Sequence, residues 1–256
     1  MGVDVTPIEL GRIEALFRYP VKSMAGERLE AGTMDWHGLE GDRRLALRKL
    51  DDRGGFPWLT ASKLPDLLRF APHRDGNGDQ GALPTHIRTP NGETLPVYGE
   101  ELATEIEHRL GAPVQMMHMK HGIFDEASVS VIASDTVAEI TRLAGQSPDV
   151  RRFRPNVLVR LLRSGPFQED AWVGGVLRLG EGVDAPAVAV TMRDVRCSMV
   201  NFDPDSASPA PEMLKAVVRV HENTAGIYGT VTRIGRLAVG QPIFLHPASE
   251  SPGGRT

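Results

Sequence analysis

MRDVRCSMVNFDPD, residues 192–205, contains the only cysteine of the 256-residue chain. A single cysteine cannot form an internal disulfide, so Cys197 is a buried filler, a reactive thiol or a metal ligand. Arg193 and Arg196 precede it, and neighbouring cations favour the thiolate, which is the form that binds soft or transition metals. Residue type alone leaves the buried filler and the functional thiol equally open.

The composition is ordinary for a globular protein, with 41% hydrophobic residues, 24% charged residues and a formal net charge of −4. Since there is no basic excess, we expect neither nucleic acid nor a membrane among its partners. The apolar runs are too short to span a bilayer, and the first residues show no basic-then-apolar signal pattern. The sequence therefore predicts a soluble, cytoplasmic protein.

Glycine and proline are frequent and scattered, with 27 and 19 residues. This pattern is typical of short strands joined by turns and predicts a mainly β (α+β) fold. Strands are expected over residues 12–18, 29–36, 44–49, 157–161, 172–179, 187–192 and within 229–245. Helices, with apolar residues at helical spacing, are expected over 99–111, 134–145 and 211–220.

Two clusters of cations border predicted strands. The turn after strand 12–18 presents Lys22 and Ser23, which either hold an anion or are simply solvated. Residues 151–156 place three arginines ahead of strand 157–161. Arginine suits phosphate because its planar guanidinium donates two parallel hydrogen bonds. Surface salt bridges are the alternative, which we prefer from these residues alone.

Five motifs along the chain occur in the order found in a known superfamily. They are Arg18–Ser23, Gly38–Arg43, Phe56–Leu67, Arg152–Asn156 and Arg196–Asp205. Each motif is weak alone, but their order is specific, and the resemblance covers about residues 8–246. The chain resembles the MOSC superfamily. It is similar to its two-part proteins, which include the mitochondrial amidoxime-reducing components and bacterial reductases of N-hydroxylated bases.

The resemblance implies a two-part architecture. The expected parts are a smaller N-terminal β-barrel-like domain at residues 8–122, a MOSC-type β-barrel domain with a few flanking helices at 123–247, and a loose C-terminal tail at 248–256. We place the boundary here because the composition becomes irregular around residues 119–127, between two predicted helices.

The resemblance also implies a site for the molybdenum cofactor, a pterin whose dithiolene holds molybdenum and whose tail carries a phosphate. Cys197 matches the cysteine that gives the metal its protein thiolate, and it is our catalytic and metal-binding candidate. The positions that match pterin and phosphate contacts are Lys22, Ser23, Arg43, Arg154 and Asn156. Ser134 begins a predicted helix whose first amides are a further candidate contact, and its alternative role is an N-cap.

Two aspartates follow the cysteine. Asp203 and Asp205 either orient the cysteine segment by accepting backbone hydrogen bonds or handle protons near the metal, and we favour the first role. Relatives often have two threonines where this chain has Met199–Phe202. If those threonines shape the substrate side, the specificity of this chain differs.

The function that the resemblance implies is a molybdenum-cofactor oxidoreductase, which reduces N-hydroxylated or N-oxide small molecules by two electrons. In that reading Cys197 anchors the metal and the cofactor carries the chemistry. The electrons then come from a separate flavin, haem or iron–sulfur protein, since one cysteine cannot bind an iron–sulfur cluster in this chain.

Two other functions stay open. A sulfur or molybdenum-cofactor carrier would use a Cys197 persulfide, because MOSC domains also occur at the end of molybdenum-cofactor sulfurases. Those enzymes give the family its association with pyridoxal phosphate. Their aminotransferase portion, with its Schiff-base lysine, is missing here, which argues against a complete sulfurase but not against a carrier. The third function is a cofactor-free β-barrel interaction module, in which Cys197 affects only stability.

Overall fold

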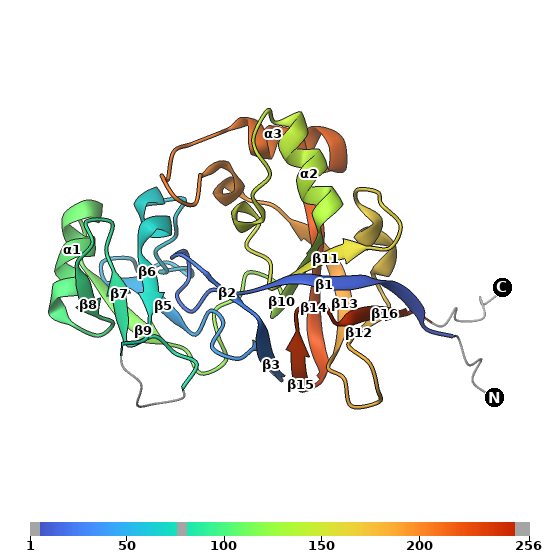
Figure 1. Ribbon diagram of the computed structural model, residues 1–256. Helices are drawn as coiled ribbons and strands as arrows, with labels where there is room; N and C mark the ends of the chain where they lie inside the picture. The colour runs from blue at the N-terminus through green and yellow to red at the C-terminus, as the bar shows by residue number, and fades with distance from the viewer. Residues whose placement is uncertain (1–5, 76–80, 249–256) are drawn as a thin grey trace, which may run out of the picture.

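The computed structural model describes residues 6–75 and 81–248 and shows two lobes joined side by side (Figure 1). Strands make up most of the regular structure, and the described residues contain three α-helices and four short 3-10 helices. The mainly β (α+β) fold class is therefore confirmed. The predicted C-terminal tail lies outside the described residues except for Ala248.

The larger lobe is a seven-stranded β-barrel. Its strands are β1 (Ile8–Arg18), β10 (Val129–Ala133), β11 (Val157–Leu161), β12 (Val176–Leu179), β13 (Ala187–Val195), β14 (Thr224–Arg233) and β16 (Pro242–His246). The order is β11-β10-β14-β13-β12-β16-β1, and the pairing of β1 with β11 closes the ring. The β10–β11 pair is parallel and the other pairs of the ring are antiparallel. Because the sheet is closed, each strand of the ring has a partner on both sides.

Apolar side chains fill the interior of the barrel, and each of the seven strands contributes two of them. Burying one such side chain contributes roughly 1.5–3 kcal/mol of hydrophobic stabilisation. The fourteen residues are Ile13, Leu16, Val129, Val131, Val157, Val159, Leu177, Leu179, Val188, Val190, Ile227, Val231, Ile243 and Leu245.

Helices α2 (Ser134–Leu143) and α3 (Glu212–His221) pack side by side over one outer face of the barrel (Figure 1). The register of β1 against β11 shifts between Ile13 and Ala15. Ile13 therefore joins the barrel interior, whereas Ala15 and Phe17 join the apolar cluster beneath the two helices. Because β1 is covered on both faces, its apolar residues do not mark a single buried face.

The smaller lobe contains two small sheets around its own apolar cluster. One pairs β5 (Leu45–Lys49) with β9 (Val114–His118). The other has the order β6-β7-β8, formed by Ala71–His73, His86–Arg88 and Thr94–Pro96. Helix α1 (Glu100–Leu110) packs against β8 and β9, and η1 (Pro65–Arg69) adds Leu67 to the cluster.

Strands from both sides of residue 122 build the larger lobe. β1 lies between β11 and β16 and also pairs with β2 (Glu27–Leu29). β3 (Ala31–Asp35) pairs with β15 (Gly235–Ala238) and with β4 (Gly38–Leu39) in a further sheet. The N-terminal strands therefore pack with the C-terminal half of the chain, and the domain boundary at residue 122 stays a prediction.

The three predicted helices are found as α1, α2 and α3. The strand expected over 172–179 is shorter, because the 3-10 helix η3 (Gln168–Trp172) ends at its first residue and β12 begins at Val176. Gly174, with φ of +87°, interrupts the extended run. The remaining 3-10 helices are η2 (Val150–Arg152) and η4 (Ser198–Asn201). None of the helices in residues 6–75 and 81–248 combines the length and hydropathy needed to cross a membrane.

Gly226 in β14 combines a left-handed backbone with a close neighbour. Its φ is +78°, and a Cβ atom there would lie 2.6 Å from the carbonyl oxygen of Val131. Gly240 has a φ of +86° but no atom within 4 Å of the corresponding position. We expect Gly226→Ala to lower the free energy of unfolding by about 1 kcal/mol or more beyond the loss in Gly240→Ala. Urea denaturation measures both losses, and equal values would contradict the expected clash with β10.

Candidate functional site

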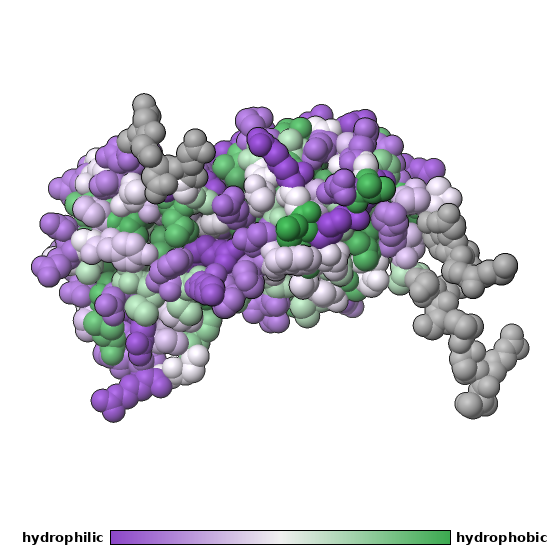
Figure 2. Space-filling view, turned by 90° about the horizontal axis from the view of Figure 1, so that it is seen from below, coloured by the Kyte–Doolittle hydropathy of each residue, from purple (hydrophilic) through white to green (hydrophobic). Residues whose placement is uncertain are grey.

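A small pocket of about 60 Å³ lies beside Cys197. It brings together five of the seven predicted site residues, namely Lys22, Ser23, Arg43, Arg154 and Cys197. The lining comes from segments that connect the two lobes and from loops at one end of the barrel. On the face shown in Figure 2, hydrophilic residues gather where the two lobes meet.

Cys197 lies between the end of β13 and the start of η4, and it is exposed. The buried-filler interpretation is therefore wrong. The hydroxyl of Ser198, the next residue, is hydrogen-bonded to the hydroxyl of Ser62 with 3.1 Å between the oxygens. An exposed thiol in the lining of a pocket is accessible to a ligand.

Lys22 and Ser23 form the turn that follows β1. The amide of Lys22 donates a hydrogen bond of 2.8 Å to the carbonyl of Leu45, and Ser23 turns the chain with a left-handed φ of 66°. Lys22 is only 7% exposed, and its Nζ lies 2.7 Å from Oδ1 of Asp125. A buried ammonium group requires a partner of this kind, so Lys22 is not merely solvated.

Arg43 and Arg154 lie against the ring of Tyr19, with Cζ atoms 5.2 and 4.1 Å from its centroid. Arg43 pairs with Asp42 and donates a hydrogen bond of 2.9 Å to the carbonyl of Arg154. Arg154 donates through Nη1 to the carbonyl of Met24 at 2.7 Å, but its buried Nη2 has no partner among the described residues. Burial, together with the charge of Arg43, lowers the pKa of Arg154 to about 10, so the guanidinium stays charged at neutral pH.

Lys22, Arg43 and Arg154 are called the cation cluster below. All three line the pocket beside the cysteine. A buried guanidinium with an unused N–H is a ready donor to an anion. Arg154 and Tyr19 also line a second cavity of about 310 Å³, so the guanidinium borders open space in two directions.

Asp194 and Arg196 hold the end of β13 in place just ahead of the cysteine. Asp194 is 1% exposed, accepts a hydrogen bond of 3.0 Å from the Ser130 hydroxyl and pairs with Arg196 at 2.7 Å. Arg196 also donates to the carbonyls of Phe153 and Ala225 at 2.7 and 2.8 Å. Burial raises the pKa of Asp194 to about 6, although Arg196 acts in the opposite direction.

The arginines that precede the cysteine are occupied by other partners. Arg193 pairs with Asp170 and Glu222 at 3.3 and 3.1 Å, and Arg196 is neutralised by Asp194. Carboxylates thus compensate the charge of both arginines, and the effect of these arginines on the thiol stays a prediction. The cation cluster and Arg196 both line the pocket that contains the thiol.

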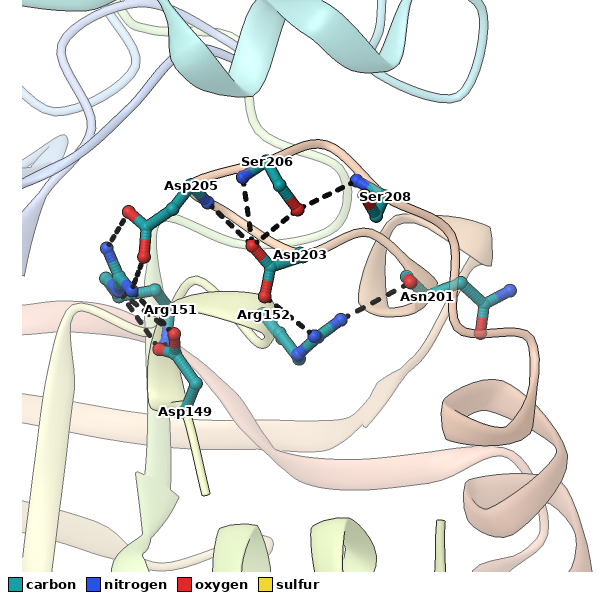
Figure 3. A network of polar contacts seen from close by, with 8 residues as sticks. All are labelled: Asp149, Arg151, Arg152, Asn201, Asp203, Asp205, Ser206 and Ser208. Carbon is teal, nitrogen blue, oxygen red and sulfur yellow. Dashed lines mark hydrogen bonds and ion pairs between the residues drawn. The ribbon is translucent and has the colours of Figure 1, made fainter. Parts of the chain in front are cut away.

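A network of ion pairs and hydrogen bonds fastens the segment after the cysteine to η2 (Figure 3). Arg152 pairs with Asp203 at 3.0 Å, and Arg151 pairs with Asp205 at 2.6 Å. Asp203 also accepts hydrogen bonds from the amides of Asp205 and Ser206, as predicted, whereas the Asp205 carboxylate accepts from the side chain of Arg151. Arg151 and Arg152 thus follow the salt-bridge alternative, although Arg152 lines the pocket as Arg154 does.

Asn156 and Ser134 lie outside the lining of the pocket. Asn156 is 1% exposed, accepts from the amide of Ser130 at 3.1 Å and donates to the carbonyl of Phe17 at 3.3 Å, so it ties β1 to β10. Ser134 is the first residue of α2 rather than its N-cap, and its hydroxyl donates to the carbonyl of Val159 at 3.3 Å. Their contacts with a cofactor stay predictions.

Among the other residues that line the pocket are Asp125, Asp194 and Tyr228, which were not predicted. Asp194 lies two residues before Arg196 in the stretch that contains the cysteine. An acidic residue this close to an arginine could have indicated an ion pair. Tyr228 lies in β14, and burial raises its pKa above the ordinary value. Asp125 lies in the irregular segment between β9 and β10, for which the sequence indicated only a boundary. Tertiary folding, not a motif, brings Asp125 and Tyr228 to the cysteine.

Two family models match the chain. The model of the MOSC domain matches residues 98–244, and the model of the MOSC N-terminal beta barrel domain matches residues 10–134. The two matches overlap, so they do not decide the boundary predicted at residue 122. No curated protein matches the chain.

Solved structures resemble the chain at low sequence identity. The YuaD protein from Bacillus subtilis is 16% identical, with 94% of this chain and 97% of that chain covered and a TM-score of 0.51. YiiM from Geobacillus stearothermophilus is 19% identical, with 46% and 54% covered and a TM-score of 0.36. The likeness to YuaD concerns the fold alone. The family matches cover more than half of the sequence, and by them the chain belongs to the MOSC family, whose domains are associated with the molybdenum cofactor.

Proposed function

We propose that this chain is a molybdenum-cofactor oxidoreductase, which reduces N-hydroxylated or N-oxide small molecules with electrons from a separate donor protein. The observation that carries the proposal is the exposed thiol of Cys197 in one pocket with the cation cluster. A thiolate beside fixed positive charges suits a ligand that is both a soft metal complex and an anion. The MOSC domain match supports the same cofactor.

The residues present fit the charged end of such a cofactor. Nη2 of Arg154 and Oη of Tyr19 are buried and lack partners within the described residues. Buried donors without acceptors are costly, and an anionic ligand would supply the acceptor that Arg154 lacks. Within residues 6–75 and 81–248, no group of three or more His, Cys, Asp or Glu is placed to hold a metal ion. A metal that the cofactor already holds by its own sulfur atoms needs only one further ligand from the protein, such as Cys197.

Each of the seven predicted site residues then has a defined task. Sγ of Cys197 would bind the metal, the cation cluster would bind the anionic tail, and Ser23 would add a hydroxyl donor. Asn156 and Ser134 would act indirectly, by holding β1, β10 and β11 in place. When bound, the cofactor would supply the two-electron redox chemistry. An N–OH group, two electrons and two protons give an N–H group and water, so atoms and electrons balance.

Protein made in a molybdate-fed, cofactor-competent host is expected to contain nearly stoichiometric molybdenum and pterin. Elemental mass spectrometry and pterin fluorescence measure the two components. Oxidation of reduced viologen by an amidoxime or a hydroxylamine then measures turnover, with protein from a molybdate-free culture as the control. Folded protein with neither molybdenum nor pterin would contradict the assignment. The cytoplasmic location and the separate electron donor stay predictions.

The exposure of Cys197 favours a second candidate, a sulfur or cofactor carrier. In that role the thiolate would accept a sulfur atom from a donor persulfide, which leaves as a thiolate. Cold cyanolysis measures the transferable sulfur. Molybdenum-loaded protein that turns over no N-hydroxylated compound in a broad panel, but releases thiocyanate, would select the carrier over the reductase.

A further inference from the structure

We propose that Asp125 decides which anions enter the pocket. Its carboxylate occupies the position of a ligand's anionic group beside the cation cluster. Only a ligand that also binds Cys197 displaces it. Small free anions, such as inorganic phosphate, are thereby excluded. The inference deepens the proposed function and rests on it for the identity of the admitted ligand.

The contacts of Asp125 are those expected of a bound anion. Its Oδ1 accepts a hydrogen bond of 2.7 Å from Nζ of Lys22, and both residues line the pocket. Desolvation acts to raise the pKa of Asp125, but Lys22, Arg43 and Arg154 together hold it below its ordinary value. The carboxylate is therefore charged at neutral pH, and all three members of the cation cluster stabilise that charge.

The space that remains is too small for a cofactor while Asp125 is in place. The pocket has a volume of about 60 Å³, whereas pockets that bind small molecules usually exceed roughly 300 Å³. A ligand that occupies this pocket, rather than the cavity of about 310 Å³ that Arg154 also lines, must therefore displace the carboxylate. Its own anionic group then replaces Asp125 as the partner of Lys22, so the buried ammonium group is not left without an acceptor.

Few contacts hold the segment that carries Asp125 in place. Residues 124–128 contain no helix or strand, and no backbone hydrogen bond joins them to the rest of the described chain. They run between Ile123, whose amide donates to the carbonyl of Arg43, and the first residue of β10. The side chain of Asp125 is 61% exposed, so it loses little packing when it leaves.

This competition favours ligands that bind the protein at two points over ligands that bind at one. Inorganic phosphate replaces the Lys22–Asp125 ion pair with a similar contact of its own, so its binding gains little free energy. A ligand that also binds the thiolate of Cys197 has a second attachment, which offsets the loss of the Lys22–Asp125 pair. The Asp125 carboxylate thus lowers the affinity of the pocket for every anion. It prevents binding only of those anions that contact the cation cluster without also binding Cys197.

The test is a calorimetric titration of the metal-free protein with inorganic phosphate. Asp125→Asn keeps the shape of the side chain and removes its charge, and we expect phosphate to bind it about tenfold more tightly than the wild type. Glu126→Gln is the matched control, because Glu126 is an exposed neighbour with the same charge and no ion pair to the described residues. It is expected to bind phosphate like the wild type.

Each outcome decides the proposal. Unchanged or weaker phosphate binding by Asp125→Asn would overturn it, and weaker binding would mean that Asp125 itself supports the ligand. An equal gain in Glu126→Gln would also overturn it, since net charge would then explain the effect. Adding Lys22→Met to Asp125→Asn should abolish the gain, and Asp125→Ser replaces the asparagine variant if that one does not fold. The titration needs no molybdenum, so its failure is distinct from the absence of molybdenum and pterin that would contradict the proposed function.

Discussion

Molybdenum content is expected to fall at least about tenfold when Cys197 is replaced with alanine, because the thiolate is the metal's only protein ligand in the proposed site. The fold should be almost unaffected, since the side chain is exposed, and the free energy of unfolding should change by less than about 0.5 kcal/mol. Elemental mass spectrometry on both proteins from one molybdate-fed host measures the metal. Urea denaturation measures the stability.

Ser198→Ala is the matched control for that substitution. It removes the hydroxyl that contacts Ser62 but leaves the neighbouring thiol in place. It is expected to retain molybdenum at the level of the wild type. Equal molybdenum in Cys197→Ala and the wild type would show that the thiol is not a ligand and that the cation cluster alone retains the cofactor.

Asp194→Ala is expected to lower the free energy of unfolding by about 3–5 kcal/mol, because it leaves a buried guanidinium without its charged partner. Arg196 is 7% exposed and pairs with Asp194 at 2.7 Å. The carbonyls of Phe153 and Ala225 would still accept its hydrogen bonds, but they cannot neutralise its charge. Urea denaturation at neutral pH measures the loss.

Asp205→Ala provides the contrast. It also removes the carboxylate partner of an arginine, but the side chain of Asp205 is 72% exposed and that of Arg151 44%. Exposed pairs contribute little, and we expect a loss of less than about 1 kcal/mol. Similar losses in the two variants would show that burial does not set the contribution of the Asp194–Arg196 pair.

Local elements of the fold followed from sequence patterns, whereas the barrel was predicted only through the resemblance to a family. The helices α1, α2 and α3 follow from apolar residues at helical spacing, which is a property of neighbouring residues. The pairing of β1 with β11 and β16 joins segments from opposite ends of the chain, and no local pattern records it. The same long-range pairing explains why a boundary near residue 122 does not separate the strands of the larger lobe.

Some residues of the candidate site were likewise predictable from the sequence, and others were not. Cys197 stands out because it is the only cysteine, and Lys22 and Arg43 lie in motifs that resemble a family. Arg193 is close to the cysteine in sequence but does not line the pocket, and it pairs with carboxylates elsewhere. Asp125 gave no signal, since its role depends on where an irregular segment crosses the pocket.

The ring of strands also sets the order in which the molecule can be completed during synthesis. Arg12 in β1 donates to the carbonyl of Gly240, 228 residues later, and β1 pairs with β16 beside it. While the chain is still emerging from the ribosome, β1 lacks its partner strand β16. The turn at Lys22, which follows β1, then cannot pack against a complete barrel. Contacts so distant in sequence form slowly. Any prosthetic group in the proposed site would therefore be inserted after β16 has been synthesised.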